Sequence, residues 1–333
     1  MSDPLPTPLL APLQGRAPDP PAWFAAALAQ APQRRRHAVQ GAPIETLSWG
    51  ESGRPGLLLL HGKMAHADWW SFIAPFFAAT HHVVALSFAG MGGSGWREAY
   101  SVETMAAEAM AVARAEGLFD SPHKPVFVAH SFGGFASLRC AERHGAQLGG
   151  VVTLDMPLLS QQQRIERNAT RGSAIRGRFS QRPTRVYGTL AEALARFRFA
   201  PPQGCDNLFI ADHIARTSLK QVPNGDLNGD LSGDTRGAAP GWTWRFDPRV
   251  AQIHPGEPER SLRAAACPVA LMWGSDSGLV DPAVAAHVVS LSPPGTPHIE
   301  IPAARHHVMV DQPLALVAAL RGLLSGWPRA AAL

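Results

Sequence analysis

The chain has 333 residues, of which 46% are hydrophobic and 17% charged, and its formal net charge is +4. This composition supports a sizeable apolar core and excludes an intrinsically disordered chain. The 30 prolines and 31 glycines follow no three-residue period, which excludes a collagen-like fibre. The length fits two domains, or one large α/β domain that carries an insertion.

The N-terminus and the cysteines favour a cytoplasmic protein. Met1–Pro4 lacks the basic segment that opens a secretory signal, and the longest apolar run, Ala22–Ala29, is much too short to span a membrane. Cys140, Cys205 and Cys267 include no Cys-x-x-Cys pair, which argues against a disulfide framework and a zinc knuckle. We expect a cytoplasmic protein without a membrane span, and both a monomer and a homodimer remain open.

Two segments of unusual composition carry no visible chemistry. Residues 1–40 form an arm rich in alanine and proline, with a short helix expected at Ala22–Gln30. Residues 160–200 hold nine arginines against two glutamates, and such a basic stretch can bind nucleic acid. Aromatic side chains interleaved to stack on bases are absent there. We therefore expect a solvated helix face and no nucleic-acid partner.

From Arg35 onward, short apolar runs alternate with helical patterns. This alternation predicts βαβ units and a mostly parallel sheet. Helices are expected at Val102–Glu116, after the N-cap Ser101, and at Phe132–His144, which Gly145 ends. The expected strands are Ile44–Trp49, Gly56–His61, His82–Ser87, Pro125–His130, Gly149–Asp155, Pro268–Trp273 and His298–Ile301.

The alternation stops between Pro157 and Cys267. This interval, about 110 residues, is too long for a loop in a compact domain. We expect a largely helical cap at residues 157–263, inserted into an α/β core formed by residues 41–156 and 264–333. The cap is expected to hold helices at Ser160–Arg176, Thr189–Phe197 and Asn207–Leu219, and a solvated loop at Asn224–Asp234.

The strongest chemical signal is the segment 129–134, Ala-His-Ser-Phe-Gly-Gly, between a buried strand and a helix. A nucleophilic serine needs a sharp strand-to-helix turn, and small residues two positions before and after it leave room for that turn. Ala129 stands where the Gly-x-Ser-x-Gly pattern has glycine, so the pattern is missed while its steric requirement is met. We expect Ser131 to be a nucleophile, with the positive end of the following helix directed at it.

This segment resembles the nucleophile turn of the α/β-hydrolase family. The resemblance implies an acid and then a histidine further along the chain. Asp276, just after the strand Pro268–Trp273, is the preferred acid because the carboxyl ends of strands face the ligand crevice of an open sheet. Asp155, at the end of an earlier strand, is the position that some family members use. Asp281 is a third candidate, although we expect it to cap the helix that starts at Pro282.

The segment 304–313 resembles the family's histidine loop and the start of its last helix. In that pattern the catalytic histidine usually precedes the helix-opening proline, here Pro313, by seven residues. This spacing selects His306 over its neighbour His307. Chemistry alone does not separate two adjacent histidines.

The segment Leu59–Lys63 resembles the family's His-Gly segment, where a backbone N–H forms half of the oxyanion hole. The resemblance implies that the backbone N–H groups of Lys63 and Phe132 are the two donors. The side chain of Lys63 departs from the family's small or apolar residue. It either meets an anionic substrate or points to solvent, and we favour solvent.

Together these residues imply a serine hydrolase that cleaves a carboxylic ester or a related acyl compound through an acyl-enzyme, without a metal or an organic cofactor. The expected partner is a small, mainly apolar molecule. Candidate substrate-binding residues are His61, Trp69, Trp70, Trp242 and Trp244. Carbon-carbon bond hydrolysis and acyl transfer use the same three side chains and stay open, as does a non-catalytic ligand-binding protein, although such proteins often lose one of the three.

Two other kinds of site match only in part. The run Gly90–Gly95 follows a strand and fits the dinucleotide-binding pattern Gly-x-Gly-x-x-Gly. However, five residues separate it from the next helix, and no acidic residue ends a strand about 20 residues further on. Both features disfavour a dinucleotide site. His66 and Asp68 lack the second histidine of a zinc-hydrolase motif. The sequence therefore predicts neither a nucleotide cofactor nor a metal.

Overall fold

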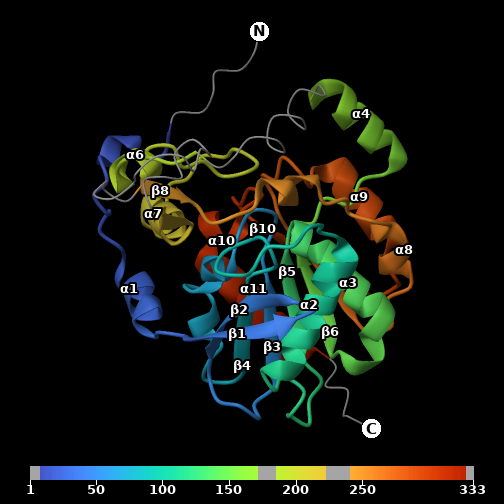
Figure 1. Cartoon of the computed structure of the whole chain (residues 1–333). Coiled ribbons are helices and arrows are strands. Elements are labelled where there is room, and N and C mark those ends of the chain that lie inside the picture. Colours follow the sequence, from blue (N-terminus) through green and yellow to red (C-terminus); the bar gives the residue numbers. More distant parts are fainter. Residues whose placement is uncertain (1–7, 172–184, 223–240, 328–333) are drawn as a thin grey trace.

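The computed structural model describes residues 8–171, 185–222 and 241–327. Its centre is an eight-stranded sheet with the order β1-β2-β4-β3-β5-β6-β9-β10 (Figure 1). β2 pairs antiparallel with β1 and with β4, and the other neighbouring strands of this sheet are parallel. The strands are β1 (Gln33–Val39), β2 (Ala42–Trp49), β3 (Gly56–Leu60), β4 (His82–Leu86), β5 (Val126–His130), β6 (Gly150–Leu154), β9 (Val269–Gly274) and β10 (His298–Ile301).

The two faces of the sheet bury separate apolar layers. Leu57 and Leu59 of β3 belong to one layer and Leu58 and Leu60 to the other, as the alternation of side chains along a strand requires. Because both faces are covered, all five residues of β3 are buried and the strand has no polar face. The first layer contains residues of α1 (Ala22–Ala29) and α11 (Pro313–Gly326), and the second contains residues of α2 (Val102–Ala115), α3 (Phe132–His144) and α9 (Pro282–Leu291).

The predicted α/β class, with a mostly parallel sheet between helices, is confirmed. All seven expected strands are present, with ends shifted by at most two residues. The two expected core helices are α2 and α3, and the Ser101 hydroxyl caps α2 by accepting the N–H of Thr104 at 3.1 Å.

Strand β1 is absent from the sequence prediction. It begins Gln-Arg-Arg-Arg, and such a charged run shows no apolar alternation. The strand lies at the edge of the sheet, where charged side chains are favoured because they discourage further pairing. Arg34 binds Glu45 and Arg35 binds Glu116, each at 2.6 Å. Residues 33–39 of the predicted arm are thus part of the central sheet.

The described parts of residues 157–263 are mainly helical. Figure 1 shows α6, α7 and β8 together above one side of the sheet and α4 above the other side. The three expected helices correspond to α4, α6 and α7, whereas the end of the first one beyond residue 171 and the tract Asn224–Asp234 lie outside the described residues. β7 and β8 form an antiparallel pair that the sequence did not predict. The elements of this region are α4 (Gln161–Arg171), α6 (Leu190–Leu194), α7 (Leu208–Thr217), β7 (Leu219–Val222), β8 (Gly241–Trp244) and α8 (Pro258–Arg263).

Two arginines of the basic stretch have protein partners. Arg164 of α4 binds Glu259 of α8 at 2.5 Å, and Arg167 donates to the carbonyl of Leu279 at 2.7 Å. The expectation of a merely solvated face is wrong for these two side chains. They attach α4 to the neighbouring helix and to the loop after β9.

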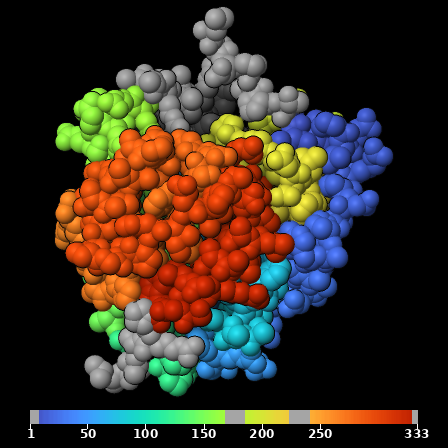
Figure 2. All heavy atoms as spheres, turned by 180° about the vertical axis from the view of Figure 1, so that it is seen from behind, coloured from blue at the N-terminus to red at the C-terminus, as the bar shows by residue number. Residues whose placement is uncertain are grey.

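The face opposite to that of Figure 1 is formed mainly by the C-terminal part of the chain, orange and red in Figure 2, with the blue N-terminal segment along one edge. Trp327, just after α11, donates its indole N–H to the carbonyl of Gly149 at 2.8 Å. An added Cβ at Gly150 would lie 2.3 Å from the Trp327 ring, so only glycine fits there. In the part of the chain described here, no helix is both long and apolar enough to cross a membrane.

Candidate active site

Ser131 lies at a sharp turn between β5 and α3. Its φ is +52° and its ψ −120°, a conformation that costs a residue other than glycine about 1–3 kcal/mol. The backbone N–H of Ser131 donates to the carbonyl of Leu154 on β6 at 2.8 Å, which holds the turn against the sheet. This strained turn places Ser131 at the carboxyl end of β5, the position that a nucleophile occupies in such a turn.

Three glycines surround this turn because their neighbours leave no room for a side chain. A Cβ on Gly133 would lie 2.5 Å from the carbonyl of His61, and one on Gly134 would lie 2.8 Å from the sulfur of Met156. A Cβ on Gly62 would lie 3.1 Å from the Ser131 Cβ. Gly62 and its segment therefore pack directly against the nucleophile turn.

His306 and Asp155 are hydrogen-bonded to each other. The imidazole Nδ1–H donates to Asp155 Oδ2 at 2.6 Å, and both side chains are buried. The carboxylate also accepts the hydroxyl of Ser277 at 2.8 Å and the N–H of Gly274 at 3.1 Å. Three donors thus fix Asp155, and Asp155 fixes the orientation of the His306 ring.

A hydrogen bond with His130, the residue before Ser131, connects His306 to the nucleophile turn. The His130 Nε2–H donates to the carbonyl of His306 at 3.0 Å, and the ring centroids are 4.9 Å apart. Within the described residues, the Ser131 hydroxyl makes no hydrogen bond. Bonds between a nucleophile and its base are often long without substrate.

Asp276 does not lie in this arrangement, which corrects the preferred sequence assignment. Its side chain is exposed and accepts a hydrogen bond from the Ser275 hydroxyl at 2.9 Å. The end of β9 and the loop after it instead bring the Gly274 N–H and the Ser277 hydroxyl to Asp155. The third candidate, Asp281, caps α9 as expected by accepting the Val284 N–H at 2.9 Å.

The segment with the expected oxyanion donor Lys63 is fixed by His61. His61 Nδ1–H donates to the Gly62 carbonyl at 2.7 Å, and Nε2 accepts the N–H of Phe88 at 2.9 Å. Burial lowers the pKa of His61 to about 3, so its ring is neutral. Both ring nitrogens are engaged with the backbone. His61 was predicted to bind substrate, and in the structure its ring holds Gly62 and Phe88 through these two contacts.

The backbone N–H groups of Lys63 and Phe132 have no hydrogen-bond partner within the described ranges. Phe132 is the first residue of α3, and the first N–H groups of a helix have no partner inside it. Lys63 follows Gly62, which packs against Ser131. The turn at Ser131 thus has two unengaged backbone donors beside it.

The Lys63 side chain has neither of its two expected environments. Its ammonium donates to the carbonyls of Ala251 and Ile253, at 3.2 and 3.1 Å, and lies 4.2 Å from the centre of the Phe132 ring. Burial lowers the pKa of Lys63 to about 8. The lysine joins both expected oxyanion segments to η6 (Pro248–Gln252).

An aromatic group extends from the histidine loop toward β8. Trp69 of η2 (Ala67–Trp70) is buried, with ring centroids 5.4 Å from His307 and 5.9 Å from Phe199. Phe199 contacts Phe197 at 5.0 Å, and Phe197 contacts Trp244 at 6.2 Å.

The other two predicted aromatic residues lie elsewhere. Trp70 is fully buried in the core beneath η2. Trp242 is half-buried on β8 and pairs through its backbone with Tyr187. Of the four tryptophans predicted to bind substrate, Trp69 and Trp244 therefore belong to the aromatic group next to His307.

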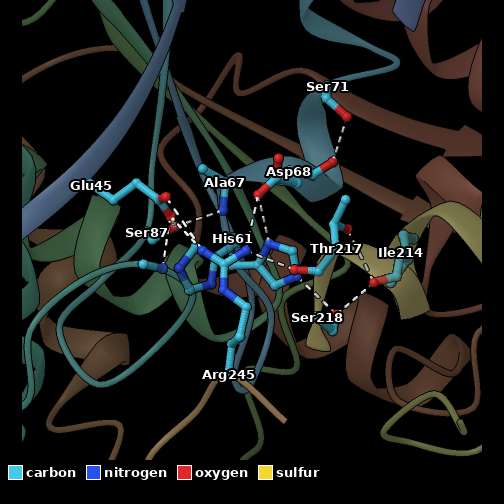
Figure 3. Close-up of polar contacts among 12 residues, drawn as sticks. Glu45, His61, Ala67, Asp68, Ser71, Ser87, Ile214, Thr217, Ser218 and Arg245 are labelled. Carbon is cyan, nitrogen blue, oxygen red and sulfur yellow. Dashed lines mark hydrogen bonds and ion pairs between the residues drawn. The ribbon is translucent and has the colours of Figure 1, made fainter. Parts of the chain in front are cut away.

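A second buried polar network joins residues 214–218 and 245 to the central sheet (Figure 3). Glu45 on β2 accepts the Ser87 hydroxyl at 2.9 Å and faces the guanidinium of Arg245 at 3.4 Å. Burial acts to raise the pKa of Glu45. The charge of Arg245 and the hydrogen bonds that Glu45 accepts nevertheless hold this pKa below its usual range. Arg245 also donates to the carbonyl of Thr217 at 2.8 Å. The network attaches α7 and β8 to the core, and no sequence motif indicated it.

Ser218 and Asp68, both labelled in Figure 3, form with His66 an arrangement that resembles a second catalytic triad. His66 lies 2.8 Å from the Ser218 hydroxyl through Nε2 and 3.2 Å from Asp68 through Nδ1. However, the Ser218 hydroxyl has a single hydrogen and directs it to the Ile214 carbonyl, 2.6 Å away, and not to His66. A nucleophile must instead donate to its base. These three residues hold α7 on η2.

Comparisons with known proteins agree with this geometry. The profile of the Alpha/beta hydrolase family matches residues 57–320. The chain belongs to the α/β-hydrolase family. No curated protein sequence matches it significantly.

Solved structures of similar fold include three hydrolytic enzymes. The thioesterase domain from the curacin biosynthetic pathway is 19% identical, with a TM-score of 0.67 over 87% of this chain and 99% of that one. E-2-(acetamidomethylene)succinate hydrolase is 17% identical, with a TM-score of 0.68 over 88% and 99%. An esterase from Mycobacterium tuberculosis is 20% identical, with a TM-score of 0.63 over 91% and 97%. At these identities, the likeness shows the fold.

Proposed function

We propose that this protein is a serine hydrolase that cleaves a carboxylic ester or a related acyl compound, with Ser131 as nucleophile, His306 as base and Asp155 as the orienting acid. The hydrogen bond between His306 and Asp155, next to the strained turn at Ser131, carries the proposal. It fixes the tautomer in which Nδ1 is protonated and Nε2 is free to accept a proton.

The reaction proceeds in two steps. Ser131 Oγ attacks the acyl carbon while His306 Nε2 takes the hydroxyl proton, and Asp155 stabilises the resulting imidazolium. His306 then gives this proton to the leaving alcohol, which departs from the tetrahedral intermediate. Water releases the acyl group in the second step, with His306 again acting as base.

The oxyanion of each tetrahedral intermediate is held by the backbone N–H groups of Lys63 and Phe132. One such donor contributes roughly 10²- to 10³-fold in rate. The contacts of Lys63 and His61 support this assignment because they fix the segment in place before substrate arrives.

The aromatic group beside His307 supports a small, mainly apolar substrate. Trp69, Phe199, Phe197 and Trp244 offer apolar surface that continues from the histidine loop, and aromatic walls are typical of sites for apolar ligands. Similar folds in an esterase and a thioesterase domain are consistent with an acyl substrate. A cytoplasmic location and a monomeric or homodimeric state remain part of the proposal.

The proposal is tested with a fluorophosphonate probe and a panel of short p-nitrophenyl esters. We expect wild type to be labelled and to turn over esters, and Ser131→Ala to lose labelling and at least about 10³-fold in kcat while keeping its circular dichroism spectrum. Labelling without ester turnover would favour carbon-carbon bond hydrolysis or acyl transfer. Ester turnover by Ser131→Ala near the wild-type rate would refute the mechanism, and a wild type that binds small ligands but resists the probe would be a binding protein.

A further inference from the structure

Three buried histidines meet beside the nucleophile turn. One ring nitrogen from each of His130, His306 and His307 lies within 4.8 Å of the other two. His130 ends β5, whereas the other two lie 176 and 177 residues further along the chain, just before α10 (Val308–Asp311). The proposed mechanism uses only His306.

Two of these rings already have the hydrogen bonds that metal ligands require. His130 donates Nε2–H to the carbonyl of His306, and His306 donates Nδ1–H to Asp155. Each therefore has its other ring nitrogen as a lone-pair donor. A histidine that binds a metal usually donates its second ring N–H to a carbonyl or a carboxylate in this manner.

His307 supplies an independent observation. It is 3% exposed, and neither ring nitrogen makes a hydrogen bond of good geometry within the described ranges, although the ring lies close to the backbone of Pro201. An unsatisfied polar group in the interior costs about 1–3 kcal/mol. A buried imidazole nitrogen that makes no good hydrogen bond is available to bind a metal ion.

We propose that a transition-metal ion of the zinc type binds reversibly to His130, His306 and His307 and inhibits the enzyme. The ion takes the lone pair of His306 Nε2 that must accept the Ser131 proton, so binding and catalysis exclude each other. The inhibition rests on the proposed function, whereas the binding does not. Imidazole ligands suit Zn²⁺, Cu²⁺, Ni²⁺ and Co²⁺, and the absence of a carboxylate from this histidine group disfavours Mg²⁺ and Ca²⁺.

The site needs only a small rearrangement to hold such an ion. Zn–N bonds are about 2.0–2.1 Å long, which places ligand nitrogens of a tetrahedral site about 3.4 Å apart. The three nitrogens lie within 4.8 Å of one another, so the rings must approach by at most about 1.4 Å. His307 has no hydrogen bond of good geometry to lose when its ring turns. Three protein ligands leave one position open for water.

Binding is measured without turnover by titrating the purified protein with Co²⁺ and recording its visible absorption. Wild type and Ser131→Ala are expected to bind one Co²⁺ with the strong bands of a tetrahedral site. His307→Asn and His130→Asn are expected to bind at least tenfold more weakly, since each removes one ligand. His298→Asn removes an exposed histidine on β10 and is the matched control, with wild-type affinity expected.

Inhibition is measured with Zn²⁺ and a p-nitrophenyl ester, and activity is expected to return on addition of EDTA. The concentration of Zn²⁺ that halves the activity should rise at least tenfold in His307→Asn and stay unchanged in His298→Asn. Equal Co²⁺ affinity in wild type, His307→Asn and His130→Asn would overturn the site. Co²⁺ binding by a wild type that lacks ester activity would support the site and count against the proposed function alone.

Discussion

The Nδ1 of His306 and the Oδ2 of Asp155 are joined by a hydrogen bond of 2.6 Å between residues 151 positions apart in the chain. Asp155 follows β6 directly and has a φ of +50°, which turns its side chain toward the histidine loop. Two of the three donors to this carboxylate come from Gly274, the last residue of β9, and from Ser277 in the loop that follows. The chain thus uses β6 for the acid and β9 for its support.

This hydrogen bond predicts a large loss of kcat on substitution of Asp155 and almost none on substitution of Asp276. Asp155→Asn should lower kcat by about 10³- to 10⁴-fold, because an amide donates to the imidazole and favours the wrong tautomer. Asp276→Asn should keep kcat within about twofold, since its side chain is exposed and, in the part of the chain that the structure describes, hydrogen-bonds to Ser275 alone. Steady-state kinetics with one p-nitrophenyl ester compares the two variants. A large loss in Asp276→Asn together with a small one in Asp155→Asn would reverse our assignment.

The sequence predicted the central sheet well because each buried strand is a continuous apolar run, as in β3. It also predicted the turn at Ser131, since a strand, small residues and a helix follow one another there. The choice between Asp155 and Asp276 depends on which of two adjacent loops approaches His306. That distance is set by packing at Gly274, where an added Cβ would lie 2.2 Å from the Ala304 carbonyl, and no local pattern encodes it.

The contacts of Lys63 and His307 could not be predicted from the sequence either, because they also join distant parts of the chain. Lys63 binds carbonyls 188 and 190 residues away, and backbone carbonyls have no side-chain signature. His307 joins His130 only because the end of β5 and the histidine loop meet at the same edge of the sheet. Contacts of this kind follow from topology rather than from spacing.

Lys63 is expected to make stability depend on pH in the alkaline range. Its pKa is about 8 in the folded protein and 10.5 as the ordinary value. Between these values the unfolded chain binds a proton that the folded chain does not, so the free energy of unfolding rises with pH. Relative to Lys63→Met, wild type should gain about 1–3 kcal/mol from pH 8 to 10.5. Urea denaturation across this range measures the difference.

The control for this experiment is Lys220→Met, which removes an exposed lysine of β7. The difference between wild type and Lys220→Met is expected to stay constant from pH 8 to 10.5. A constant difference for Lys63→Met as well would show that the Lys63 ammonium remains charged and solvated in the folded protein.

Buried histidines are expected to destabilise the protein in acid. Burial lowers the pKa of His61 to about 3 and holds those of His130 and His307 well below 6.5. Below pH 6.5 the unfolded chain gains protons that the folded chain resists, so stability is complete above this pH and falls as the pH decreases. Each histidine contributes up to about 1.4 kcal/mol per pH unit.

The variant His307→Phe isolates one of these contributions. Phenylalanine fits the aromatic surroundings of Trp69 and Phe199, and the loss of stability between pH 7 and 5 should become smaller by the share of one histidine. Urea denaturation at both values measures it, with His298→Asn as an exposed control that keeps the wild-type slope. An identical slope in His307→Phe would mean that His307 titrates normally in the folded state.

The strained turn at Ser131 is expected to cost stability. Glycine adopts a φ of +52° and a ψ of −120° without the strain that a Cβ introduces. Ser131→Gly should therefore be about 1 kcal/mol more stable than Ser131→Ala, although both are inactive, with part of the relief lost to the greater freedom of glycine in the unfolded chain. The matched control is Ser137→Gly, six residues further along in regular α3, which should lose about 1 kcal/mol. Urea denaturation measures these free energies of unfolding. Equal values for Ser131→Gly and Ser131→Ala would mean that the turn stores no strain. If glycine is more stable than alanine at position 131 but less stable than serine at position 137, the strain lies at the nucleophile.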